Sequence, residues 1–286
     1  MKRFVTLCAA GIVAGGILLS AQAIPTPRRG AGDSVTGAFE GWFYNADGSR
    51  AFLIGYYNRN SQQELDIPIG PNNHIEPGGP DMGQPTHFLA GRNWGMFAVP
   101  VPRDFKPDDQ IIWTLVANGI STSIPLRTRA DYVMSPFTEI AVGNTPPVVK
   151  FDPAGAGIQG PIGSLTTAPT MSASASAPMT LNVWASDDMK YTSGTNAPLT
   201  SQRAPVTVHW TKYRGPGAVT FDKARPTVEK LPSGSAPFNG KATATAKFSE
   251  PGDYVLHLSA NDYSGDGGGG FGCCWTTSVV KVSVKP

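Results

Sequence analysis

Short runs in which apolar and polar residues alternate, each closed by a turn signal, recur along this chain of 286 residues. Successive side chains of a strand point to opposite faces, so a period of two buries one face of a sheet. No segment of residues 35–143 has the period of a helix. We therefore expect an all-β protein built as two β-sandwich domains in tandem. The clearest alternating runs are 51–57, 110–117, 206–210, 242–248, 254–260 and 280–284.

The first expected domain spans residues 35–143 and opens with a β-hairpin. Residues 45–48 (NADG) lie between two alternating runs and supply a turn in which Gly48 takes a positive φ. Residues 70–85 are rich in Gly and Pro, which predicts a loop. Asn118-Gly119 is the strongest hairpin signal in the chain. The further strands expected here are 64–69, 94–101, 110–117 and 120–126.

The composition changes at Asn144, where a stretch rich in Pro, Gly, Ala, Ser and Thr begins and runs to residue 178. We place the domain boundary there and treat 144–178 partly as linker. Within that stretch a strand is expected at 148–151, and the rest is expected to be a loose connection. Five alternating runs follow, at 181–185, 206–210, 242–248, 254–260 and 280–284. With them the domain 144–286 fits a Greek-key sandwich of immunoglobulin (Ig) type. The two domains are expected to be separable.

Three segments of the second domain resemble bacterial extracellular Ig-like modules of the polycystic-kidney-disease (PKD) type. They are 206–213 (VTVHWTKY), 215–221 (GPGAVTF) and 244–262 (ATAKFSEPGDYVLHLSAND). Tyr254 follows a Gly-Asp turn, where a tyrosine corner buries its ring and returns its hydroxyl to nearby backbone. The resemblance covers roughly 80 residues and implies a spacer, an adhesive unit or a substrate-presenting appendage. The first domain resembles no family we can name.

The N-terminus carries the three parts of an export signal. Lys2 and Arg3 precede an apolar run at 8–20, and Ala21-Gln22-Ala23 matches a small-x-small cleavage pattern. The run is shorter than the roughly 20 residues that a membrane-spanning helix needs. We expect cleavage after Ala23, a linker at 24–34, and a periplasmic or extracellular protein with no stable membrane insertion. The alternative is an uncleaved N-terminal anchor.

Charge limits the classes of partner. The chain has 23 basic and 21 acidic residues, and loss of Lys2 and Arg3 with the signal leaves 21 of each sign. A neutral chain without a basic run argues against nucleic acid or an anionic membrane surface as partner. We expect an extracellular protein or a polysaccharide instead.

Two groups of residues have the chemistry of metal ligands. His74, Glu76, Asp81 and His87 lie in the Gly/Pro-rich region and suit zinc or copper, although Gly and Pro alone also account for a loop. Asp187 and Asp188 follow one strand of the second domain, and Asn261, Asp262 and Asp266 follow another. Both strands end at the same end of an Ig sandwich, so these oxygens suit calcium. The alternative is that Asp and Asn simply favour turns. No cofactor other than calcium is expected.

The remaining candidates are aromatic and histidine residues. Trp42, Tyr44 and Tyr57 form either a sugar-binding platform or, with Tyr56, Trp94 and Trp113, part of the core. His209 and His257 fall at outward positions of their strands, which predicts a solvated sheet face. No Gly-x-Ser-x-Gly elbow is present. We expect a non-catalytic binding, adhesive or structural protein. The alternative is a secreted enzyme or a metal-binding protein that uses the loop 70–93.

Cys273 and Cys274 are the only cysteines left after signal cleavage. Adjacent residues of a strand face opposite ways, and exposed thiols rarely stay free in an oxidising compartment. Glycines precede the pair and permit unusual backbone angles. We expect a vicinal disulfide with a twisted or cis peptide bond. The alternatives are two thiols or an intermolecular bridge.

Overall fold

The computed structural model describes residues 29–140, 143–161, 165–190, 204–232, 234, 236–262 and 273–286. These residues are almost entirely β, apart from one 3₁₀ turn at Ala130–Tyr132. The expected signal peptide lies outside the described residues. Within the described ranges no helix is long and apolar enough to cross a membrane.

The first sandwich packs a sheet of order β1-β2-β6 against one of order β4-β7-β8, with the ribbon β3-β5 at its side. Its core cluster includes Phe52 and Ile54 from one sheet and Ile75, Trp113 and Leu115 from the other. The strands are β1 (Val35–Tyr44), β2 (Arg50–Asn58), β3 (Leu65–Asp66), β4 (Asn73–Glu76), β5 (His87–Phe88), β6 (Gly91–Pro100), β7 (Ile111–Ala117) and β8 (Ile120–Leu126).

The predicted hairpins are confirmed. Residues Tyr44 and Arg50 pair across the first turn, and Asn118 and Gly119 have φ values of 50° and 77° at the second. The expected loop 70–85 is wrong in part, because it contains β4, which pairs with β7. Asn73 fixes this short strand: its amide donates to the carbonyls of residues 67 and 85 at 2.9 and 2.8 Å. Four residues among so many Gly and Pro gave no periodic signal.

The second sandwich has the strand order of the Ig fold. One sheet runs β9-β11-β15-β13 and the other β12-β16-β17, which is the A-B-E-D and C-F-G arrangement. The strand β10 is added parallel to β17, and β14 pairs with β15. The strands are β9 (Val148–Lys150), β10 (Thr170–Ser174), β11 (Met179–Asp187), β12 (Thr207–Arg214), β13 (Val219–Phe221), β14 (Glu229–Lys230), β15 (Phe238–Phe248), β16 (Gly252–Asn261) and β17 (Trp275–Lys285).

The expected tyrosine corner is present at the start of β16. The Tyr254 hydroxyl donates to the Glu250 carbonyl at 2.9 Å and accepts the Gly217 N–H at 3.1 Å, while the ring is buried in the core of the second sandwich. One expectation fails in this domain. The Ser/Ala-rich stretch predicted as a loose connection contains β10, whose pairing with the edge of β17 supplies the order that its composition did not indicate.

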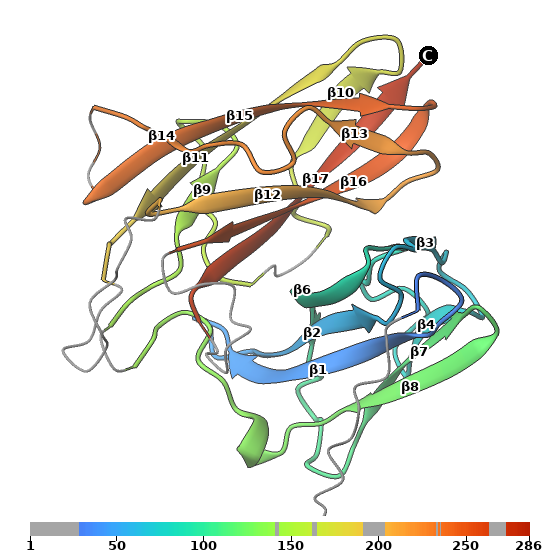
Figure 1. Ribbon diagram of the computed structural model, residues 1–286. Coiled ribbons are helices and arrows are strands. Elements are labelled where there is room, and N and C mark those ends of the chain that lie inside the picture. Colours follow the sequence, from blue (N-terminus) through green and yellow to red (C-terminus); the bar gives the residue numbers. More distant parts are fainter. Residues whose placement is uncertain are drawn as a thin grey trace, which may run out of the picture.

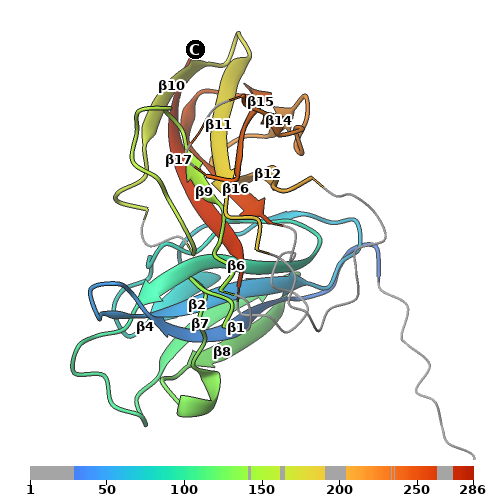
Figure 2. The same cartoon turned by 90° about the vertical axis from the view of Figure 1, so that its left-hand side faces the viewer.

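The two sandwiches lie next to each other, with β6 of the first beside the lower ends of β16 and β17 of the second (Figures 1 and 2). Tyr213 of β12 and Val279 of β17 are fully buried within the core cluster of the first sandwich. Trp275 lies in a second cluster on the other face of the β1-β2-β6 sheet, with Phe43, Leu53 and others. Figure 2 shows the lower end of β17 reaching β6. Both faces of that sheet are therefore buried.

Ion pairs and hydrogen bonds reinforce this contact. Arg214 makes two bonds to Asp81, at 2.9 and 2.8 Å, and also donates to the carbonyl of residue 84. The Tyr213 hydroxyl donates to the Gly83 carbonyl at 2.5 Å. Lys212 Nζ lies 3.0 Å from Asp66. The strand β12 is therefore the main polar link between the domains.

Candidate functional site

Alternate residues of β12, β16 and β17 point away from the core of the second sandwich and toward the first. Val208, Trp210 and Leu258 belong to that core, so their neighbours in sequence face outward. Strand register sets the outward residues in rows. His209 lies opposite Ser259, Thr211 opposite His257, and Asn261 opposite Trp275.

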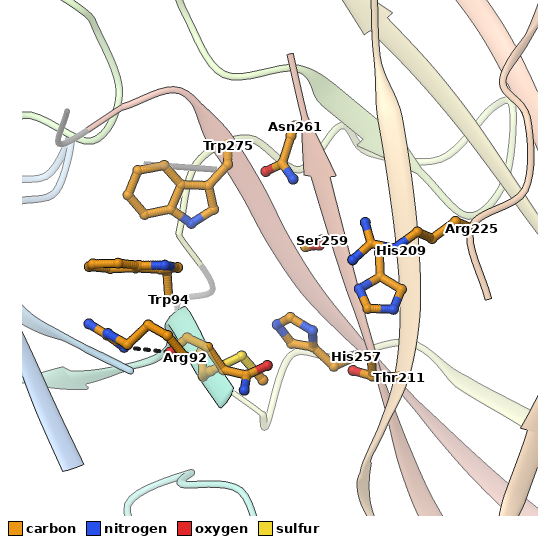
Figure 3. Close-up of a pocket in the computed structure, with 11 residues that line it drawn as sticks. Arg92, Trp94, His209, Thr211, Arg225, His257, Ser259, Asn261 and Trp275 are labelled. Carbon is orange, nitrogen blue, oxygen red and sulfur yellow. Dashed lines mark hydrogen bonds between the residues drawn. The ribbon is translucent and has the colours of Figure 1, made fainter. Parts of the chain in front are cut away.

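These rows form one wall of a cavity of about 120 Å³ between the two sandwiches. The strand β6 forms the opposite wall with Arg92, Asn93, Trp94 and Met96. Figure 3 shows Trp94 and Trp275 on one side, His209 and Arg225 on the other, and His257 between them. The backbone N–H of Trp210 donates to the carbonyl of Ala224 at 2.8 Å. This bond holds the next residue, Arg225, beside the cavity.

Arg92 and Trp94 form a rigid part of the β6 wall. The Arg92 guanidinium lies 3.7 Å from the centre of the Trp94 ring and donates to Glu40 at 2.5 Å. It also donates to the carbonyls of Tyr56 and Asn93, at 3.0 and 2.8 Å. Burial raises the pKa of Glu40, and the charge of Arg92 opposes this rise. Arg92 is thus locally neutralised and fixed in place.

The Trp275 indole sits against backbone that only glycine allows. Gly95 has a φ of 52°, and a Cβ placed on it would lie 2.8 Å from the indole Nε1. Any larger residue at position 95 would push the indole away from β6. The close approach sets one edge of the cavity.

Several buried polar atoms that line this cavity have no hydrogen-bond partner in the described part of the chain. They are Thr211 Oγ1, His257 Nε2, Asn261 Oδ1 and Trp275 Nε1. An unpartnered buried polar group costs about 1–3 kcal/mol, and native proteins contain few of them. Four of the residues that line this one cavity therefore carry such an atom.

Both histidines are neutral at pH 7. Burial, with a smaller effect of neighbouring His209, lowers the pKa of His257 to about 3. Burial, with a smaller effect of Arg225, lowers the pKa of His209 to about 4. The imidazole of His257 also stacks on the Tyr213 ring, at 5.8 Å between centres. Such weakly basic imidazoles are poor general bases near neutral pH.

The expectation that His209 and His257 lie on a solvated face is wrong. His257 is only 3% exposed, and His209 lines the same cavity. Periodicity placed both residues on the outward face, but it could not show that the first sandwich covers that face. Arg225 and Trp275 also line the cavity, and the sequence did not predict them as site residues. Neither residue belongs to a motif, so no sequence signal marked them.

The candidate metal ligands of the loop 70–93 contact different partners in the structure. The two ring nitrogens of His87 lie 3.0 Å from Asp66 and 3.3 Å from Glu64, and Asp81 is bound by Arg214. His74 and Glu76 line an open hollow on the β4-β7 side, and His74 Nδ1 lies 3.1 Å from the carbonyl of residue 71. Among the described residues no group of three or more His, Cys, Asp or Glu is arranged to hold a metal ion. The transition-metal site stays a prediction.

Four of the five residues proposed for calcium lie at one end of the second sandwich, namely Asp187, Asp188, Asn261 and Asp262. Asp266 lies outside the described residues. Burial raises the pKa of Asp187 to about 7, and the charges of Asp262 and Asp188 raise it further in the same direction. Asn144 Nδ2 donates to Asp262 at 2.6 Å, and Thr145 donates to Asp188 at 3.0 Å. Calcium binding here stays a prediction.

The proposed aromatic ligand site is spread along the first hairpin. Trp42 is buried, and its Nε1 donates to the Arg129 carbonyl at 2.7 Å. Tyr44 is 56% exposed beside the turn, where it packs on the edge of Trp42. Tyr57 pairs with Thr36 toward the other end of the hairpin. The structure therefore does not bring these three rings together.

A disulfide joins Cys273 to Cys274, and the peptide bond between them is cis. The expectation that both side chains are exposed is wrong, because they are only 3% and 0% exposed. Cys274 Sγ lies 3.4 Å from the carbonyl of Asn144, at the start of the second domain. Trp275 of the cavity follows directly, so the pair sits where β17 enters the contact between the sandwiches.

No protein-family model matches the chain, and no curated protein matches it. Among solved structures, the D00-D0 domain of intimin covers 87% of this chain and 97% of its own, with 13% identity and a TM-score of 0.24. Domains 4 and 5 of the S-layer protein SbsC cover 89% and 98%, with 10% identity and a TM-score of 0.23. A protein of unknown function from Porphyromonas gingivalis W83 covers 87% and 99%, with 9% identity and a TM-score of 0.24. With no family shown, the Ig-like class of the second domain follows from its strand order.

Proposed function

We propose that this chain is an exported, non-catalytic protein that binds a small polar ligand between its two β-sandwiches. One observation carries the proposal: four residues from three strands that line a single cavity each carry a buried polar atom without a partner in the described part of the chain. A contact that only joined two domains would favour apolar residues at such positions. A ligand that exchanged hydrogen bonds with these atoms would recover their cost.

Binding is favoured over catalysis by the chemistry of the lining. Ser259 and Thr211 are the only residues with a hydroxyl group among those that line the cavity. No carboxylate lines the cavity to orient a histidine, as a catalytic triad requires. The two imidazoles hold protons too weakly for acid–base work at neutral pH. The alternative, an enzyme or metal protein using the loop 70–93, is weakened because Asp81 is bound by Arg214 of the second domain and His87 by Asp66 and Glu64.

Export is the second part of the proposal, and it is supported by the signal at residues 1–23. Protein recovered from outside the cytoplasm should begin at Ile24 in N-terminal sequencing. An intact Met1 would contradict export with cleavage. Within this proposal the second domain presents the cavity in the manner of a PKD-type binding module.

Thr211→Val tests the cavity directly, since it removes a buried unpartnered hydroxyl and keeps the side-chain shape. Without ligand the variant should be equally or more stable, by up to about 1–2 kcal/mol. Ligands should be screened by the fluorescence of Trp94 and Trp275, which line the cavity. We expect a saturable change in the parent chain that Thr211→Val weakens at least fivefold. Thr220→Val, at an exposed position of β13, is the matched control. A destabilised Thr211→Val variant with unchanged ligand response would show that the atoms only bind structural water.

A further inference from the structure

The cavity has an unusual balance of charge. Its lining carries two arginines and two histidines and no Asp or Glu. Arg92 is paired with Glu40, which lies behind it. Arg225 makes no ion pair within the described part of the chain, and it is close enough to His209 to lower the pKa of that imidazole. The cavity therefore has a positive potential that no lining group balances.

The unpartnered atoms add directed hydrogen-bond donors to this potential. The Trp275 indole N–H can only donate, and the Thr211 hydroxyl and the His257 ring can each donate to an acceptor in the cavity. The Asn261 amide presents either its oxygen or, turned over, its nitrogen. Donors from three strands thus converge on one small volume beside a free guanidinium. This is the arrangement by which proteins hold carboxylates and phosphates.

We propose that the ligand of the cavity is a compact oxyanion, a carboxylate or phosphate group, and that its binding is coupled to proton uptake by the two histidines. The inference rests on the proposed function. A volume of about 120 Å³ admits one such group with little else. Guided by the free guanidinium, the anion binds between Arg225 and the Trp275 indole, while the Arg92–Trp94 pair closes the far side.

Proton coupling follows from the groups that face the histidines. His257 of β16 lies near His209 and stacks on the ring of Tyr213, both from β12, and His209 lies near Arg225 from the segment after β13. Arg92 is the one charged group that β6 contributes to the lining. An anion among these groups stabilises the imidazolium form of both histidines, so it raises both pKa values. By linkage, the anion binds more tightly as the pH falls.

Calorimetry of the full chain with acetate and with its neutral isostere acetamide tests the inference. The two probes have the same size and differ in the charge of the carboxylate, so they are the matched pair. We expect acetate to bind at least threefold more tightly at about pH 5.5 than at about pH 7.5, and acetamide to bind more weakly and without this pH dependence. Arg225→Gln should weaken anion binding about tenfold, and His257→Gln should abolish most of the pH dependence. Arg59→Gln, outside the cavity, should change neither.

Each other result has a distinct meaning. Acetamide binding as tightly as acetate, with loss in Thr211→Val, would overturn the anion inference and leave the proposed function standing. No binding of any probe would count against both. Anion binding that survives both Arg225→Gln and His257→Gln would place the anion elsewhere and overturn the inference. If His257→Gln disturbs folding, Arg225→Gln decides alone, because Arg225 lies at the exposed side of the cavity.

Discussion

Tyr213 links the two sandwiches, and its substitution measures how strongly they are joined. The residue belongs to β12 of the second sandwich, yet its side chain is 0% exposed within the core cluster of the first. Its hydroxyl donates to Gly83 O, and its backbone carbonyl accepts Thr86 N–H at 3.1 Å. The free energy of unfolding of the whole chain should therefore depend on this one ring.

The size of the effect follows from what each variant removes. Tyr213→Phe leaves the Gly83 carbonyl without its donor, which should cost about 1–2 kcal/mol. Tyr213→Ala also removes a fully buried ring, which should cost about 3–5 kcal/mol. Urea unfolding followed by tryptophan fluorescence measures both values. We expect a single transition in the parent chain, because the core of the first sandwich is completed by residues of the second.

Tyr44→Phe is the matched control, because Tyr44 is more than half exposed. It should change the free energy of unfolding by less than about 0.5 kcal/mol. The reasoning would be refuted if Tyr213→Ala cost less than about 1 kcal/mol. Two separate transitions, of which Tyr213→Ala shifts only that of the second sandwich, would refute it equally.

The remaining predictions concern the domain boundary, pH, calcium and the cysteine pair. Fragments 29–143 and 144–286, expressed separately, should both show β-type circular dichroism, and the first should unfold at lower urea than it does in the whole chain; two unfolded fragments would place the boundary elsewhere. Stability should fall as the pH drops from about 6.5 toward 4, because the unfolded chain takes up the proton that buried His257 refuses, and His257→Gln should flatten this fall. Asp187 has the opposite effect on stability. Because its pKa is raised in the folded chain, Asp187 stabilises the fold at low pH, and this stabilisation is lost as the pH rises through about 7. Asp187→Asn should therefore raise the urea midpoint at about pH 8. If calcium binds beside Asp187, millimolar calcium should stabilise the parent chain at that pH and leave Asp187→Asn unchanged. Mass spectrometry of the non-reduced protein should show a monomer two hydrogens lighter than its reduced form, whereas two free thiols or a reducible dimer would exclude the vicinal bond.

The sequence predicted which residues face the core of each sandwich, but not what lies against the other face. Alternation at 254–260 correctly placed Leu256 and Leu258 inward and His257 outward. Whether an outward residue meets water depends on which residues far apart in the chain come to line the same space, as Arg92 and His257 do, and this leaves no local pattern. The short strands β4 and β10 were missed for a related reason. Each is ordered by pairing with a distant strand, not by its own composition.

The outward face of the second sandwich carries apolar and polar residues side by side. Tyr213 and Val279 bury apolar surface in the first core, and the Tyr213 hydroxyl is satisfied. Thr211 and His257 lie in the same row of the sheet as Val279, and they and Asn261 leave buried polar atoms without partners in the described part of the chain. The same strands could have continued the apolar pattern and gained stability at each of these positions. The contacts of Tyr213 and Val279 already hold the two sandwiches together without the unpartnered polar atoms. The proposed ligand would account for the energetic cost of these atoms, because it would supply the hydrogen bonds that they lack.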